Sequence, residues 1–302
     1  MGGIYIKGKV IRKIKGFYYI LEEHAKHLEE ESLHECKLRG SLKMKNNKLN
    51  CIIGDIVEFD ENEKVITAIY DRKNFLHRPL LSNIDYIGIL FAIKSPNFDF
   101  TNFQKMLLRA NEQDISVILI ISKIDLVSQE ELSDFLKKLN NIFKDNHFPI
   151  FPISIKENIG LKDFENYIHG KSITISGPSG SGKSSLINNL LGEEILETNE
   201  VSNKTSRGRH TTTESRFFKI DESTFIIDTP GFSTIEFPKL KNKKDLEKIF
   251  PDFLKFSHDC KFRDCIHVNE PNCAIKKNVE NGNISKVRYD FYLYSLNNIF
   301  NN

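Results

Sequence analysis

Residues 173–191 place an apolar strand, a glycine-rich loop and a helix-forming stretch in direct succession, and they read ITISGPSGSGKSSLINNLL. The loop from Gly177 to Ser184 fits G-x-x-x-x-G-K-[ST], a pattern whose backbone N–H groups face phosphate oxygens at a helix N-terminus. A chance glycine-rich turn is rarely framed by a buried strand and a helix. The segment therefore predicts an α/β domain in which Lys183 reaches the β- and γ-phosphates and Ser184 holds Mg²⁺. The residues expected to line the phosphates are Gly177, Pro178, Ser179, Gly180, Ser181, Gly182, Lys183, Ser184 and Ser185.

A second apolar strand ends in the segment FIIDTPG, in which Asp228 follows Ser184 by 44 residues. In phosphate-loop domains an acid at the end of a neighbouring strand holds Mg²⁺, directly or through water. Asp228 is therefore the expected Mg²⁺ partner, and the amide of Gly231 is expected to meet the γ-phosphate. An isolated Asp-Thr-Pro-Gly could also be a simple turn. Its position behind a phosphate loop makes the nucleotide interpretation more specific.

The segment SKID, residues 122–125, ends the apolar run VILIIS and so falls where α/β sheets bind ligands. An ionised Asp125 offers only acceptors, which match guanine N1–H and N2–H₂ and repel the lone pair that adenine presents there. Lys123 can lay its alkyl stem across the base, and Ser122 stands where asparagine is usual. We predict that all three side chains belong to a guanine site. In most GTP-binding folds such a segment follows the phosphate loop, so its earlier position here indicates either chance or a rotated order of parts.

Another strand ends in PIS at residues 152–154. This segment resembles the loop whose backbone contacts guanine O6, which adds Ser154 to the predicted base site. Ile155 occupies the next position, where a small residue is usual.

The periodicity of the apolar residues changes along the chain and divides it into three parts. Residues 1–70 contain several short alternating runs separated by turns, which predicts a small β-barrel of the OB type. Residues 71–236 alternate buried-strand runs with helices, which predicts a parallel sheet covered on both sides. One of these helices opens with Ser128 and Glu131 in capping-box spacing. Residues 237–302 are helical and rich in lysine, and they contain the cysteine cluster.

The net charge is only +2 over 302 residues, so a nucleic-acid partner must be argued from local clusters. Residues 1–20 carry no acid, and aromatic residues follow their cations, which are Lys7, Lys9, Arg12, Lys13 and Lys15. This pattern fits either solvated strand faces or a nucleic-acid surface. The apolar runs are too short to cross a bilayer, and the start of the chain lacks the apolar core of a secretion signal. We therefore expect a cytoplasmic location.

Three cysteines and a histidine fall within 14 residues, namely Cys260, Cys265, His267 and Cys273. They make a closed Cys₃His set, which a structural Zn²⁺ prefers, with no open position for catalysis. Disulfides are the alternative, and a reducing compartment disfavours them. His258 is a competing ligand, and the simpler interpretation makes it a surface histidine. The remaining cysteines, Cys36 and Cys51, stand alone and are expected to be buried as small hydrophobic residues.

The motif order SKID, PIS, GPSGSGKSS, GRHTTT, DTPG and C-x₄-C-x-H-x₅-C resembles that of the circularly permuted bacterial ribosome-assembly GTPases of the RsgA or YjeQ family. RKNFLHRP and SNIDYIGIL also look like that family's entry into its GTPase domain. The resemblance extends over nearly the whole chain. It implies an OB-fold at 1–70, a circularly permuted P-loop GTPase domain at 71–236 and a zinc-binding domain at 237–302. It further implies binding to the small (30S) ribosomal subunit and its 16S rRNA late in subunit maturation.

The segment GRHTTT, Gly208 to Thr213, lies between the phosphate loop and DTPG, where the first switch belongs. A threonine there can coordinate Mg²⁺ and touch the γ-phosphate only in the GTP state. We choose Thr212, with Thr211 and Thr213 as close alternatives. His210 is the candidate for orienting water, because an imidazole can do so at neutral pH, and the resemblance points to the same position. The basic residues here could also form an ordinary solvated loop.

These features predict a monomeric GTPase that uses Mg²⁺ with GTP, holds one structural Zn²⁺ and is stimulated by the small subunit. A P-loop small-molecule kinase would explain GPSGSGKS but would leave SKID, DTPG and the cysteine cluster without a role. A non-catalytic RNA-binding module with a relict nucleotide site is a third interpretation. If GTP and GDP, but not ATP, displace a labelled guanine nucleotide, the chain is a GTPase and not a small-molecule kinase. Phosphate release with and without small subunits tests the non-catalytic interpretation.

Overall fold

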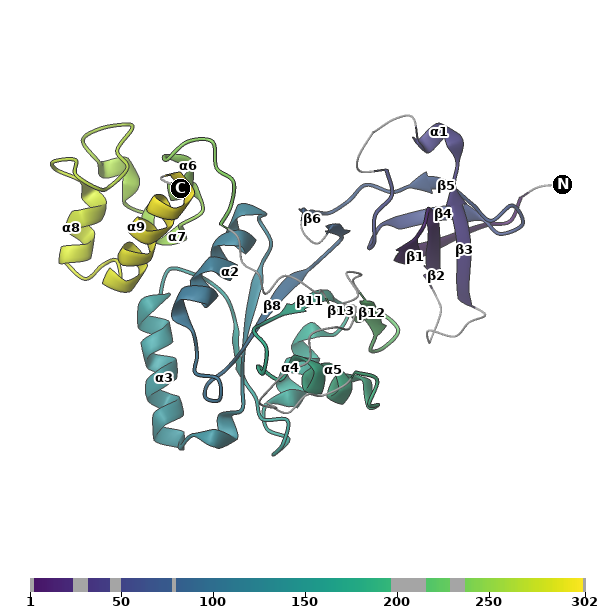
Figure 1. Ribbon diagram of the computed structural model, residues 1–302, viewed down its shortest axis with the longest axis horizontal. Helices are drawn as coiled ribbons and strands as arrows, with labels where there is room; N and C mark the ends of the chain where they lie inside the picture. Colours follow the sequence, from purple (N-terminus) through teal and green to yellow (C-terminus); the bar gives the residue numbers. More distant parts are fainter. Residues whose placement is uncertain are drawn as a thin grey trace, which may run out of the picture.

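A computed structural model of the chain describes residues 3–23, 32–43, 50–77, 80–196, 216–228 and 237–300. They form a small β-barrel, a central sheet with helices on both faces, and a helical C-terminal part (Figure 1). The barrel and the C-terminal helices lie at opposite ends of the molecule (Figure 1). No helix in these ranges combines the length and hydrophobicity needed to cross a bilayer. The boundary predicted at 236/237 falls at the edge of a segment outside the described residues.

The barrel closes in the order β1-β2-β3-β5-β4, and its β3 and β5 strands are parallel while the other pairs are antiparallel. This is the Greek-key closure of an OB-fold, which confirms the expected fold. A tight turn joins the first two strands, with positive φ at Lys15 (46°) and Gly16 (90°). Alternate residues point inward, so Ile20 and Phe59 are fully buried in the barrel core. The elements are β1 (Tyr5–Ile14), β2 (Phe17–Glu22), β3 (Leu33–Leu38), α1 (Gly40–Lys43), β4 (Ile56–Asp60) and β5 (Val65–Ile69).

Between the barrel and the sheet runs a short antiparallel pair, β6 (Phe75–His77) and β7 (Leu80–Ser82). The junction is held by a buried carboxylate. Asp55 accepts hydrogen bonds from Arg72 Nε at 2.7 Å and from Ser82 Oγ at 2.6 Å. The Asp55 side chain is fully buried, and these partners satisfy its hydrogen-bonding capacity. The Asp55–Arg72 ion pair therefore fixes the barrel to the start of the central domain.

One cation predicted for the outer surface of the barrel instead lies at this junction. Lys9 donates to Ser172 Oγ at 2.6 Å and sits 4.3 Å from the centre of the Phe225 ring. Burial lowers the pKa of Lys9 to about 8. Sequence alternation could not reveal this, because a second domain covers that part of β1.

Within the described ranges the central sheet has six strands in the order β10-β9-β8-β11-β13-β12, in which β12 is antiparallel to β13 and every other neighbouring pair is parallel. Successive residues of β9 pack into different cores, Leu119 and Ile121 on one face and Ile118 and Ile120 on the other. This explains its continuous apolar sequence. The strands are β8 (Tyr86–Ala92), β9 (Val117–Ser122), β10 (Ile150–Pro152), β11 (Ser172–Ser176), β12 (Arg216–Lys219) and β13 (Phe225–Asp228).

Helices cover both faces of this sheet (Figure 1). Phe103 of α2 and Leu139 of α3 belong to one core, while Phe164 of α4 and Leu186 of α5 belong to the other. The capping box predicted for α3 is present, since the Ser128 hydroxyl accepts from Glu131 N at 3.1 Å and Glu131 Oε2 accepts from Ser128 N at 2.7 Å. The helices are α2 (Phe100–Glu112), η2 (Ile124–Leu126), α3 (Gln129–Ile142), α4 (Leu161–Ile168) and α5 (Lys183–Leu191).

The C-terminal part packs its helices around an aromatic core that contains Phe250, Phe253 and Tyr292. Leu108 of α2 belongs to the same cluster, so this part rests directly on the central domain. Its elements are α6 (Asp245–Lys248), α7 (Pro251–Leu254), η3 (Ser257–Asp259), α8 (Ala274–Glu280) and α9 (Lys286–Phe300).

Candidate nucleotide site and metal centre

The phosphate loop leaves β11 and enters α5, as the sequence predicts. Gly180 (φ 78°) and Gly182 (φ 90°) adopt the left-handed conformation that side chains disfavour. Gly177 is required for a different reason, because a Cβ there would lie 2.1 Å from the Leu90 carbonyl oxygen. The loop is thereby pressed against the end of β8, with its last residues opening the helix that carries Lys183 and Ser184.

Lys183 and Asp228 meet although 45 residues separate them, with Nζ 2.5 Å from Oδ1. The lysine starts α5 and the aspartate ends β13, the strand beside the phosphate-loop strand. Asp228 and the half-buried Ser184 both offer hard oxygen atoms, the ligand type that Mg²⁺ prefers. The two residues fit the predicted role of holding an Mg²⁺ ion that arrives with the nucleotide.

Ser122 connects the SKID segment to the phosphate loop. Its hydroxyl donates to the Ser181 carbonyl at 2.5 Å, and the side chain is buried. The bond joins residues 59 positions apart, the last residue of β9 and a residue of the loop after β11, and both strands are neighbours of β8. The short hydroxyl therefore holds the SKID segment and the phosphate loop together in this chain.

Lys123 follows with a left-handed backbone (φ 59°), and its Nζ donates to the Ser95 carbonyl at 2.5 Å. This contact directs the lysine side chain toward the loop that follows β8. Such a placement is compatible with a stem that lies against a planar base.

The two predicted base-contacting segments also meet. Ser154 Oγ donates to Asp125 Oδ1 at 2.6 Å and accepts from Glu157 N at 3.1 Å. Ser154 is fully buried and Asp125 is half-buried. The buried hydroxyl therefore fixes the carboxylate, whose remaining lone pairs can accept hydrogen bonds from further donors. Sequence reasoning assigned Ser154 a backbone role only and missed this hydroxyl. Ile155, the larger residue in this loop, packs on the core formed by α4 and α5.

Several predicted residues lie outside the part of the chain that the structure describes. They are the switch residues His210, Thr211, Thr212 and Thr213, and Gly231 of the DTPG segment.

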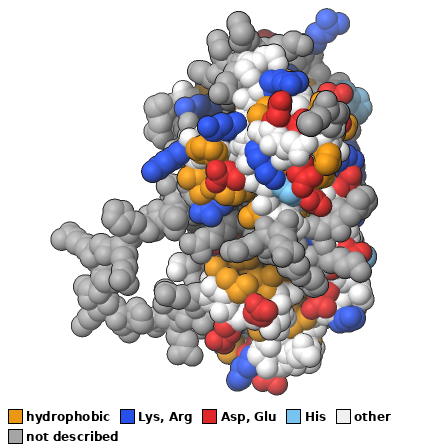
Figure 2. All heavy atoms as spheres, turned by 90° about the vertical axis from the view of Figure 1, so that its right-hand side faces the viewer, with side chains coloured by type: hydrophobic (Ala, Val, Ile, Leu, Met, Phe, Trp, Pro, Cys, Tyr) orange, Lys and Arg blue, Asp and Glu red, His pale blue; other side chains and the backbone are white. Residues whose placement is uncertain are grey.

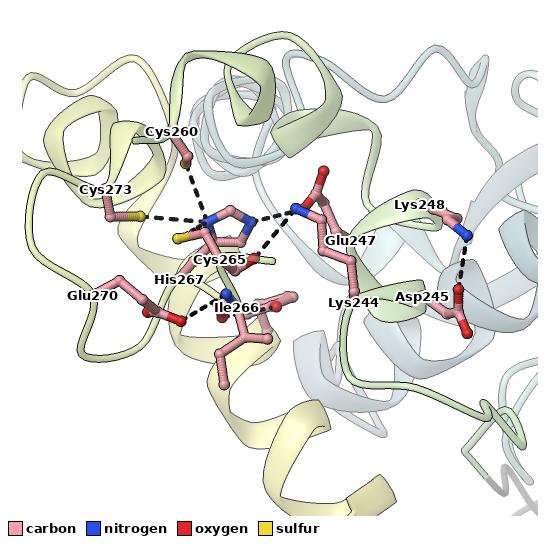
Figure 3. A network of polar contacts seen from close by, with 11 residues as sticks. Lys244, Asp245, Glu247, Lys248, Cys260, Cys265, Ile266, His267, Glu270 and Cys273 are labelled. Carbon is pink, nitrogen blue, oxygen red and sulfur yellow. Dashed lines mark hydrogen bonds and ion pairs between the residues drawn. The ribbon is translucent and has the colours of Figure 1, made fainter. Parts of the chain in front are cut away.

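The Cys₃His cluster is assembled as predicted (Figure 3). His267 Nδ1 lies 3.6, 3.4 and 3.3 Å from the sulfur atoms of Cys260, Cys265 and Cys273. A tetrahedral Zn²⁺ with Zn–S of about 2.3 Å and Zn–N of about 2.0 Å would separate nitrogen and sulfur by about 3.5 Å. The four ligand atoms therefore fit zinc, and Nδ1 is the histidine nitrogen placed to ligate it.

The chemistry of the thiols agrees with a cation site. Burial raises the pKa of Cys265 to about 12 and also raises that of Cys273. Thiolates at Cys265 and Cys273 would therefore need a bound cation to stabilise them. All five cysteines are free, with Cys36 and Cys51 buried as expected. His258 is 70% exposed and pairs with Asp259, so it stands apart from the cluster.

An acid outside the predicted ligand set completes this centre. Glu247 Oε2 lies 2.8 Å from His267 Nε2, the ring nitrogen that faces away from the sulfurs (Figure 3). Burial alone would raise the pKa of Glu247, but hydrogen bonds from His267, Lys244 and Ser257 outweigh it and hold the pKa at about 2. Nothing in the sequence pattern marks this residue, which precedes the histidine by 20 positions.

The strand order and the site together define a circularly permuted P-loop GTPase. The SKID and PIS segments and the phosphate loop meet at one edge of the sheet, yet the strands ending in SKID and PIS come before the phosphate loop in the chain. A family model described as RsgA GTPase matches residues 69–238, and one described as RsgA N-terminal domain matches residues 7–69. The chain therefore belongs to the RsgA GTPase family and is a GTPase, as the motif order predicts.

Relatives and solved structures match nearly the full length of the chain. The small ribosomal subunit biogenesis GTPase RsgA of Fusobacterium nucleatum is 46% identical over 95% of this chain and 97% of its own. The protein of the same name from Clostridium botulinum strain Eklund 17B is 39% identical over 97% of both chains. The crystal structure of YjeQ from Thermotoga maritima superposes with a TM-score of 0.79 at 29% identity, covering 99% of this chain and 100% of the other. YloQ, a circularly permuted GTPase, gives 0.77 at 28% identity, covering 99% and 96%.

Proposed function

We propose that this GTPase binds the small (30S) ribosomal subunit through its 16S rRNA and acts late in the maturation of that subunit. The observation that supports the proposal is that the SKID segment is joined to the phosphate loop and to the PIS segment. Ser122 bonds to Ser181, and Asp125 bonds to Ser154. The relatives are named small ribosomal subunit biogenesis GTPases, and these names supply the biological setting. The protein would act as a monomer in the cytoplasm.

The barrel offers the surface that we assign to RNA. Arg12 lies 5.7 Å from the ring centre of Tyr19, and Lys37 lies 4.9 Å from that of Phe17, with both cations exposed. Cations interleaved with aromatic rings suit a backbone-and-base contact. Figure 2 views the molecule from the barrel side and shows basic and acidic side chains interspersed. Local pairs rather than a continuous basic face therefore support RNA binding.

In the proposed reaction the glycine loop and Lys183 hold the phosphates, while Asp125 selects guanine. Mg²⁺, held by Ser184, Asp228 and Thr212, would supply positive charge to the transferring phosphate. A phenylalanine, Phe232, stands where Ras-like enzymes place a glutamine, and it cannot orient water. His210 is assigned that task, in a switch loop that the ribosomal subunit brings into place.

The Cys₃His cluster is assigned one structural Zn²⁺ per chain. The nitrogen–sulfur distances of 3.3–3.6 Å support this assignment. The ion would stabilise the loop that carries its ligands, and it would take no part in hydrolysis, because the four protein ligands leave no open position.

Phosphate release measured with purified small subunits tests the proposal. We expect slow hydrolysis by the protein alone and a strong increase with small but not large subunits. The His210→Ala variant should lose this increase while it binds GTP nearly as tightly as the wild type. A rate that small subunits leave unchanged would overturn the proposed function. Full stimulation of the His210→Ala variant would instead remove His210 from the reaction. Displacement of labelled GDP by ATP would argue against the guanine site.

A further inference from the structure

The histidine of the metal centre is held by a carboxylate from a different segment of the chain. Glu247 belongs to α6 and His267 to the loop between η3 and α8, and their side chains are 8% and 0% exposed. The contact of 2.8 Å joins Glu247 Oε2 to His267 Nε2. Nδ1 faces the three sulfurs. When a metal is bound, Nε2 must therefore carry the ring proton and donate a hydrogen bond to the carboxylate.

Two further contacts make Glu247 a fixed partner. Lys244 donates both to the Glu247 carboxylate and to the carbonyl of Cys265, the latter at 3.2 Å. The lysine thus ties the acid to the backbone of a second ligand (Figure 3). The position of the carboxylate is therefore set by the same loop whose histidine it holds.

Hydrogen bonds that do not involve Glu247 hold the backbone around His267. Glu270 accepts from the amides of Ile266 and Val268 at 2.8 and 2.9 Å, and the Tyr289 hydroxyl donates to the His267 carbonyl at 2.7 Å. These bonds hold the left-handed backbone of His267 (φ 60°). Removal of the Glu247 carboxylate should thus affect the imidazole ring while the loop around it keeps its backbone contacts.

We infer that Glu247 is a positioning residue for the metal centre, which fixes the His267 tautomer that presents Nδ1 and thereby strengthens zinc binding. Without the acceptor, the ring loses the partner that distinguishes its two nitrogens. Removal of such an outer partner commonly lowers metal affinity by about 10–100-fold. The inference rests on the zinc site proposed above.

Zinc affinity of the full chain, measured by competition with a chromogenic chelator, tests this role. We expect Glu247→Ala to weaken zinc binding by about 10–100-fold. Glu247→Gln should lose less, because its amide oxygen can still accept from Nε2–H. Asp245→Asn is the matched control, since Asp245 lies on the same helix and pairs with Lys248 at 2.7 Å without touching a ligand. It should bind zinc like the wild type.

Ring NMR of His267 supplies a readout that a purely structural role would not change. In the zinc-loaded wild type, Nε2 should carry the proton, and that proton should resonate far downfield because a carboxylate accepts it. The signal should move upfield in Glu247→Gln and stay in place in Asp245→Asn. Zinc affinities of both Glu247 variants equal to that of the control, with an unmoved proton signal, would overturn the inference alone. A wild-type chain that binds no zinc would overturn the zinc site as well.

Discussion

The Asp125 carboxylate stands at the carboxyl edge of the sheet, where Ser154 already donates to one of its oxygens. Asp125→Asn would turn an acceptor into a donor that faces the N–H groups of guanine. We expect this change to weaken GTP binding by several kcal/mol, or about 100-fold or more. Titration with fluorescently labelled GDP measures it. Asp134→Asn, an exposed position on α3 paired with Lys137, is the control and should bind normally. Equal affinities in the two variants would refute the guanine assignment.

The same site shows how far sequence reasoning reaches at the level of single residues. The motif identified Asp125 and Lys183 because their chemistry is tied to a fixed local pattern. It could not show that the Ser122 hydroxyl reaches Ser181, because that contact joins two loops 59 residues apart. Glu247 was invisible for the same reason, since an outer partner of a ligand has no fixed spacing from it. Contacts made by the packing of distant segments escape local patterns.

At the level of elements, α3 offers a direct test of a predicted cap. Ser128→Ala removes the side chain that accepts from Glu131 N, and leaves that amide without its acceptor. We expect a loss of about 1 kcal/mol in the free energy of unfolding, with GDP binding unchanged. Chemical denaturation gives the value. Ser133→Ala, at an exposed interior position of the same helix, should have little effect or stabilise slightly. A similar result for both serines would contradict the capping role.

The strands and helices themselves follow closely from periodicity. β9 reads as a continuous apolar run because both of its faces are buried, and α3 places its apolar residues on one side. The parallel pairing of β3 with β5 does not follow from periodicity, because it depends on the closure of the whole barrel. Likewise the burial of Lys9 follows from how the barrel docks on the sheet, and no alternation within β1 encodes it.

Across the whole molecule, a buried arginine links the C-terminal helices to the central domain. Arg288 of α9 donates to Asp252 Oδ2 from Nε at 2.9 Å and from Nη2 at 2.6 Å, and to Gln104 of α2 at 3.0 Å. Asn146, which follows α3, donates to the other Asp252 oxygen at 2.9 Å. Arg288 and Asp252 are each 2% exposed or less, so each buried charge needs the opposite charge of the other to compensate for its lost hydration.

Asp252→Ala would leave the Arg288 guanidinium buried without its counter-ion. We expect a loss of about 3–5 kcal/mol in the free energy of unfolding, measured by chemical denaturation. The exposed pair Lys286–Asp290 on the same helix is the control, and Asp290→Ala should cost at most about 0.5 kcal/mol. A loss in Asp252→Ala no larger than in this control would show that the buried network does not hold the two parts together.

The metal centre is expected to stabilise the same end of the molecule without reaching the nucleotide site. Cys265 and Cys273 belong to the core that contains Phe253 and Tyr292, and this core touches the central domain through Leu108 of α2. The residues predicted to bind the nucleotide instead lie at the carboxyl edge of the sheet, where a hydrogen bond joins Ser122 to Ser181. Loss of the ion should therefore loosen one end of the chain selectively.

Elemental analysis should find about one zinc per chain. Cys265→Ser removes one ligand, and it should increase amide hydrogen exchange from about residue 240 onward, because metal binding and folding of such a loop are coupled. GDP affinity should stay close to the wild-type value. Cys36→Ser is the control for a buried thiol outside the cluster, and its effects should remain within the barrel. A metal-free chain with a fully protected C-terminal core would contradict the structural role of zinc, because the aromatic cluster would then be sufficient to hold that fold.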